Sequence, residues 1–91
     1  MVSIELIVSN DLGFHARAAA RFVQEVSRFE SDVWLIKGSN RVNGKSIMGI
    51  LTLAAAKGDR IALEVEGPDE ERALEVLSAL VECGLGENRA K

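Results

Sequence analysis

Cysteine, histidine and aromatic side chains are scarce in this chain. The single cysteine, Cys83, excludes an internal disulfide bond, and with only one histidine, His15, a Cys/His metal cluster is excluded as well. Tyrosine is absent and aromatic residues make up 4% of the sequence, which leaves few platforms on which nucleic-acid bases would stack. The formal net charge of −3 also argues against a nucleic-acid partner.

Long apolar runs and targeting signals are missing too. No segment approaches the ~20 apolar residues that a membrane-spanning helix needs. The start, MVSIELIVSN, lacks the basic region and the small-residue cleavage site of a signal peptide. We therefore expect a cytoplasmic protein without membrane insertion. The 91 residues, 47% of them hydrophobic and 27% charged, suit one domain spanning 1–91 with a single core.

Hydrophobic periodicity predicts four strands and three helices in the order β-α-β-β-α-β-α. The expected strands are 2–8, 32–37, 41–43 and 60–66, and the expected helices are 16–28, a short segment after Ser46 that ends by Gly58, and 68–83. Pro68 suits a first helical position, and Gly84 suits the residue that ends the last helix. The polar tail 87–91 is expected to fray. This order predicts an α+β fold, in which helices cover one face of an antiparallel sheet and the other face meets solvent.

His15 lies where a loop is predicted to become a helix. If that helix starts near Ala16, its first N–H groups form a positive end that favours an anion. Arg17 adds a full charge that can grip phosphate oxygens. Four small residues leave the approach uncrowded, namely Ala16, Ala18, Ala19 and Ala20. The pattern suits a histidine that accepts and passes on a phosphoryl group, although the spacing alone favours a helix cap or a surface residue.

Ser46 marks a second candidate site. Serine is favoured as the N-cap of a helix, and a simple cap is one interpretation of this residue. The helix that follows is too apolar to bury every side, so Ile47, Met48 and Leu51 are candidates for an exposed docking patch. A phosphate on Ser46 would also be favourable at this helix start.

Two motifs give the chain a resemblance to a known family. LGFHARAAA, at 12–20, and NGKSIMGILTLAAAKG, at 43–58, are similar to the motifs of HPr, the histidine-containing phosphocarrier of the bacterial phosphoenolpyruvate:sugar phosphotransferase system. The likeness runs over nearly all of the chain and fades in the tail. It implies an open-faced sandwich with sheet order 1-4-2-3 and three helices on one face.

The resemblance also implies roles for individual residues. His15 would take a phosphoryl group from phosphorylated enzyme I and pass it to enzyme IIA domains, with Arg17 steadying the phosphate. Ser46 would be the site of regulation by an HPr kinase/phosphorylase. Partners would dock on the two helices through Ala16, Arg17, Ala20, Ile47, Met48 and Leu51. The protein would be a monomeric carrier that needs no cofactor or metal, and not an enzyme.

One position departs from the family pattern, and several alternatives stay open. Ala18 stands where the family usually has proline, which leaves the His15 loop less rigidly specified. An HPr-like carrier of a nitrogen-type regulatory system, without sugar transport, would share the histidine motif. A small-molecule-binding regulatory domain and a purely structural interaction module are the other two classes.

Overall fold

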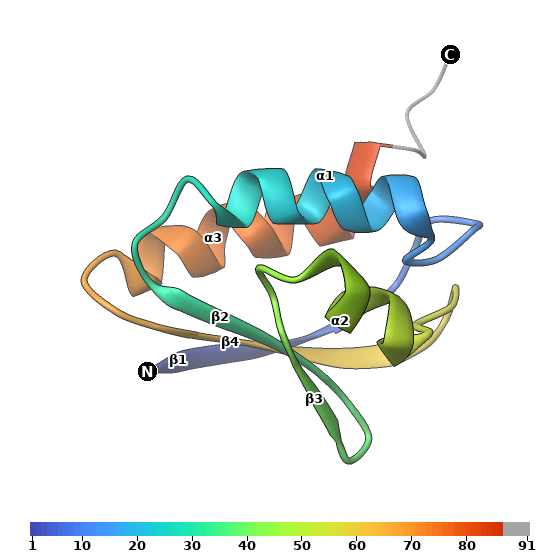
Figure 1. The fold of residues 1–91 in the computed structure, drawn as a ribbon, viewed down its shortest axis with the longest axis horizontal. Helices are drawn as coiled ribbons and strands as arrows, with labels where there is room; N and C mark the ends of the chain where they lie inside the picture. Colours follow the sequence, from blue (N-terminus) through green and yellow to red (C-terminus); the bar gives the residue numbers. More distant parts are fainter. Residues whose placement is uncertain (87–91) are drawn as a thin grey trace.

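The computed structural model describes residues 1–86, which form the predicted elements in the predicted order (Figure 1). The strands are β1 (Val2–Ile7), β2 (Asp32–Lys37), β3 (Asn40–Asn43) and β4 (Arg60–Glu66). The helices are α1 (Ala16–Val26), α2 (Ile47–Leu53) and α3 (Glu70–Glu82), and a 3-10 turn, η1 (Gly84–Gly86), follows α3. The tail predicted to fray, 87–91, lies outside the described residues.

The four strands form one antiparallel sheet in the order β1-β4-β2-β3. This is the order that the family resemblance implies, and the α+β prediction is confirmed. Leu63, on the central strand β4, lies opposite Ile4 of β1 and Leu35 of β2. Figure 1 shows α1 and α3 running side by side over the sheet, with α2 next to α1 and β3.

One face of the sheet is buried beneath the helices. Val33, Leu35, Ile61, Leu63 and Val65 are at most 1% exposed, and they pack with the apolar faces of the helices in a single core. The alternation of VSIELIV puts Ile4 on the same face as the buried Leu6, but Ile4 is 37% exposed because β1 is an edge strand with a neighbour on one side only. The opposite face carries polar and half-buried side chains, as predicted.

The last helix begins differently from the prediction. Pro68 is not its first residue, because Asp69 is the N-cap and the helix starts at Glu70. The Asp69 carboxylate does not cap α3. It accepts hydrogen bonds from the backbone N–H groups of Glu30 and Ser31, both at 3.0 Å. These bonds keep Asp69, and Pro68 before it, outside the helix. The end of α3 agrees with the prediction, because Cys83 is an exposed C-cap and Gly84 follows it in the left-handed conformation, with φ +78°.

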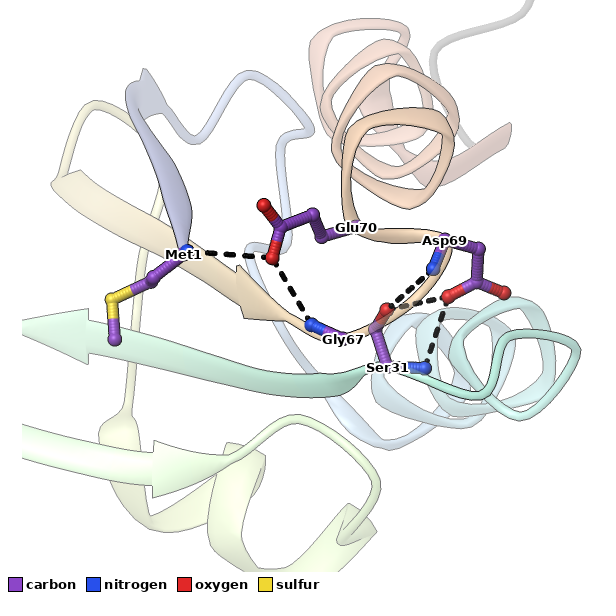
Figure 2. A network of polar contacts seen from close by, with 5 residues as sticks. All are labelled: Met1, Ser31, Gly67, Asp69 and Glu70. Carbon is purple, nitrogen blue, oxygen red and sulfur yellow. Dashed lines mark hydrogen bonds and ion pairs between the residues drawn. The ribbon is translucent and has the colours of Figure 1, made fainter.

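A polar network ties together three segments beyond the C-terminal end of α1 (Figure 2). The Ser31 hydroxyl donates to the Asp69 carboxylate, and the backbone N–H of Asp69 donates back to that hydroxyl at 3.3 Å. Glu70 accepts from the Gly67 N–H at 3.1 Å and pairs with the amino terminus of Met1 at 3.4 Å. The network therefore fixes the end of the sheet away from His15.

Candidate functional site

His15 is the N-cap of α1. Its backbone is extended (φ −80°, ψ −178°), and its carbonyl accepts the first helical hydrogen bond, from the N–H of Ala19 at 2.8 Å. The helix therefore starts at Ala16, as predicted. Within the described part of the chain, the His15 imidazole makes no capping hydrogen bond to the first turn, so the simple capping interpretation is not supported. The N–H groups that precede the first helical bond give this end of α1 its positive character.

The side chains of the first two turns of α1 divide between solvent and core. Ala16 and Arg17 are exposed and Ala20 is half-buried, so these three flank His15 on the outer side. Ala18 and Ala19 are at most 1% exposed and belong to the core. The expectation that all four alanines line the approach to His15 is therefore wrong for these two, because the helical period turns them inward beside Phe22.

Positive charge dominates the exposed face of α1 near His15. Arg17 and Arg21 are both exposed and lie four residues apart, on one side of the helix. The first turn contains no acidic residue. An anion that approaches His15 therefore meets the helix N-terminus and two guanidinium groups.

The loop before His15 is held against the segment 54–56. Gly13 has φ +64°, and a Cβ on it would stand 2.4 Å from the carbonyl oxygen of Ala55. The N–H of Phe14 donates to that oxygen at 2.9 Å. The Phe14 ring is buried edge-on against Phe22, with centroids 5.7 Å apart. These contacts fix the residue that directly precedes His15.

Ion pairs flank the same loop. Lys57 contacts Asp11 at 2.8 Å and, by hydrogen bonding and charge, lowers the pKa of that carboxyl. Asp59 accepts the Ala56 N–H at 2.8 Å and pairs with Lys37 at 2.9 Å. The pKa of Asp59 is lowered chiefly by the Ala56 hydrogen bond and next by the hydrogen bond from Lys37.

Ser46 is the N-cap of α2, as predicted. Its hydroxyl oxygen accepts the N–H of Gly49 at 3.0 Å, which satisfies one of the donors at the start of the helix. Ile47 and Met48 are 40% and 71% exposed, and Leu51 is half-buried. The prediction that these side chains remain accessible is confirmed for Ile47 and Met48 and in part for Leu51. Since α1 and α2 contact each other, the two candidate sites occupy neighbouring helices.

The sequence analysis missed two parts of this region. Leu12, three residues before His15, is 69% exposed, and it adds an apolar side chain to the loop. The segment 54–56 supplies the carbonyl that holds Phe14, and it has no motif of its own because the interaction is through the backbone. A large apolar residue inside the turn sequence SNDLG was the one available signal for Leu12.

The structure also bears on membrane and metal binding. No helix among residues 1–86 has the length and apolar character that crossing a bilayer requires. In the same residues, no cluster of three histidine, cysteine, aspartate or glutamate side chains is arranged to hold a metal ion.

Comparison with known proteins gives concordant matches. Residues 2–83 match the family model described as the PTS HPr component phosphorylation site. The chain is 53% identical over 85 residues to the phosphocarrier protein HPr of Neisseria meningitidis, with 93% of each chain covered. An HPr structure from Thermoanaerobacter tengcongensis superposes with a TM-score of 0.92 at 43% identity, covering 98% of this chain and 100% of the other. Bacillus subtilis Crh, described as an intertwined dimer with a swapped domain, gives a TM-score of 0.75 at 46% identity and covers 92% and 97%.

Proposed function

The chain belongs to the HPr family of phosphocarriers of the phosphotransferase system, and on that premise we propose that His15 is its phosphoacceptor. His15 takes a phosphoryl group from phosphorylated enzyme I, originally from phosphoenolpyruvate, and passes it to enzyme IIA domains for sugar uptake or its regulation. The observation that carries this proposal is the position of His15. It is the only imidazole of the chain, placed at the start of α1 with Arg17 exposed two residues on.

The transfer needs a nucleophile, a positive environment and an open approach. An unprotonated ring nitrogen of His15 bonds to phosphorus as the bond from phosphorus to the donor breaks, and the electron pair of that bond returns to the donor. The three non-bridging phosphoryl oxygens carry negative charge throughout the transfer. The N-terminus of α1 and the Arg17 guanidinium stabilise them by charge and hydrogen bonding. Onward transfer to an enzyme IIA domain is a step of the same kind, in which phosphorylated His15 is the donor and the enzyme IIA domain supplies the nucleophile.

The docking surface in this proposal combines α1 and α2. Its residues are those expected from the sequence: Ala16, Arg17, Ala20, Ile47, Met48 and Leu51. Exposed Met48 supplies an adaptable apolar contact, and the arginines of α1 suit a partner with an acidic surface. Phosphorylation of Ser46 by an HPr kinase/phosphorylase would place negative charge inside this surface and so regulate docking.

Labelling with radioactive phosphoenolpyruvate and enzyme I tests the proposal. We expect the wild type to gain one acid-labile phosphate and His15→Ala to gain none. The fold of His15→Ala should persist, because the imidazole is only half-buried. Ser46→Ala is the matched control and should be labelled normally. Full labelling of His15→Ala would refute the assignment of the phosphoacceptor.

We expect the carrier to act in the cytoplasm as a monomer, because His15 and both docking helices belong to one chain. Light scattering at micromolar concentration tests the oligomeric state. A stable dimer, of the kind described for Bacillus subtilis Crh, would contradict this part of the proposal.

A further inference from the structure

Lys37 and Asp59 hold both ends of the segment that supports the His15 loop. Lys37, the last residue of β2, donates from its Nζ to the carbonyl of Ala54 at 3.1 Å. The same Nζ lies 2.9 Å from Oδ2 of Asp59, and that oxygen accepts the N–H of Ala56 at 2.8 Å. The two members of one ion pair thus bind the backbone of Ala54 and of Ala56, on either side of Ala55.

The segment 54–56 contains a backbone conformation that is unfavourable without an external constraint. Ala54 has φ +53° and ψ +40°, the left-handed region that side chains with a Cβ seldom adopt. Ala54 ends α2 in this conformation and turns the chain so that the Ala55 carbonyl meets the N–H of Phe14. An external constraint on residues 54 and 56 therefore keeps the acceptor of that hydrogen bond in place.

We propose that Lys37 and Asp59 are positioning residues for His15, which they orient through the segment 54–56 and the Phe14 hydrogen bond. This rests on the proposed function of His15. Both side chains act through the backbone of the segment 54–56. Without the ion pair, Ala54 and Ala55 relax, the Phe14 N–H loses its fixed acceptor, and the N-cap residue becomes less ordered. Phosphoryl transfer then slows because the ring nitrogen is less often aligned with phosphorus.

Two substitutions that change the net charge in opposite directions test the proposal. Lys37→Met makes the protein more negative, and Asp59→Ala, which also removes the acceptor of the Ala56 N–H, makes it less negative. Positioning predicts that both lower the kcat for phosphorylation of His15 by enzyme I at least threefold, with KM unchanged within twofold. An effect on docking by long-range charge would instead move KM in opposite directions for the two variants. Lys37→Arg keeps the charge and the donors, and we expect it to retain the wild-type rate.

Hydrogen exchange of single amides supplies a readout that does not depend on phosphoryl transfer. In Lys37→Met and Asp59→Ala, the Phe14 amide should exchange at least threefold faster, while the Val23 amide in the middle of α1 should not change. Glu64→Gln is the matched control. It breaks the 3.4 Å pair of Glu64 with Arg41, and it should alter neither the rate nor the exchange.

The two readouts separate the failures. If the wild type is phosphorylated and both variants keep its kcat, the positioning role is wrong and the phosphoacceptor role stands. Unchanged exchange at Phe14 would also overturn the positioning role. If the wild type accepts no phosphate at His15, the proposed function falls, and the positioning role falls with it.

Discussion

The α-carbon of Gly13 lies so close to Ala55 that a Cβ on residue 13 would stand 2.4 Å from the Ala55 carbonyl oxygen. That oxygen also receives the N–H of Phe14. The glycine therefore permits the backbone contact that seats the His15 loop on the segment 54–56, and replacing it should disturb both the fold and the candidate site.

We predict that Gly13→Ala costs about 2–4 kcal/mol of unfolding free energy, because a steric clash adds to the penalty of a left-handed backbone. Gly38→Ala is the matched control. Gly38 has φ +62° and nothing within 4 Å of its ideal Cβ, so only the backbone penalty of about 1 kcal/mol remains. Urea denaturation of both variants measures the difference. Equal losses would show that the loop shifts without cost.

Arg17→Ala should slow phosphoryl transfer onto or off His15 at least tenfold, about 1.4 kcal/mol. The guanidinium is exposed, so the free energy of unfolding should change by less than about 0.5 kcal/mol. Arg21→Ala, one turn further from His15, should have a smaller effect on the rate. Rapid-quench kinetics with phosphorylated enzyme I measures the rates, and an unchanged Arg17→Ala rate would remove the stabilising role of Arg17.

Ala18→Pro should be tolerated and should stabilise the protein by up to about 1 kcal/mol through the unfolded state. Residue 18 lies in the first turn, before the first helical hydrogen bond, which is made by Ala19. Ala19→Pro, which removes that bond, should instead cost about 3 kcal/mol. Thermal melts compare the two, and a large loss for Ala18→Pro would mean that the buried site has no room for the ring.

Ser46→Asp should weaken the affinity for enzyme I at least tenfold while keeping thermal stability. Aspartate caps a helix as serine does, but its charge adds repulsion against an acidic partner. Ser46→Ala removes the bond to the Gly49 N–H, so it should cost about 1 kcal/mol of stability with little change in affinity. Calorimetric titration and thermal melts test both halves. Equal affinities for Ser46→Asp and the wild type would leave Ser46 as a cap alone.

The Asp69 network predicts a loss of stability in acid. The pKa of the Asp69 carboxyl lies below the ordinary value of 3.8, chiefly because of the hydrogen bond from the Ser31 hydroxyl and next because of the hydrogen bond from the Glu30 N–H. The ionised carboxylate therefore stabilises the folded state above pH 3.8, and this contribution disappears as the pH falls through the lower folded-state pKa. Wild type should exceed Asp69→Asn in melting temperature at pH 7, and the gap should close below pH 3.8. A gap that persists at lower pH would contradict the titration of Asp69.

Local chemistry determined much of this protein from the sequence alone. Alternation placed Ile61 and Leu63 on a buried face, and the helical period placed Phe22 and Val26 in the core, because each pattern reports a geometry that is set by residues close in the sequence. Ser46 was identifiable as an N-cap since a cap is an interaction with the next three residues. The start of α1 directly after His15 followed from the same local reasoning.

Tertiary structure decided what depends on contacts between distant segments. Pro68 does not open α3, because Asp69 bonds to Glu30 and Ser31, 39 and 38 residues away. Ile4 follows the buried pattern yet is exposed, because β1 forms the edge of the sheet. The contact between Gly13 and Ala55, and the ion pair of Lys37 with Asp59, likewise join segments that the chain brings together only on folding. Sequence patterns report the geometry of neighbouring residues, whereas these contacts depend on how strands and helices pack.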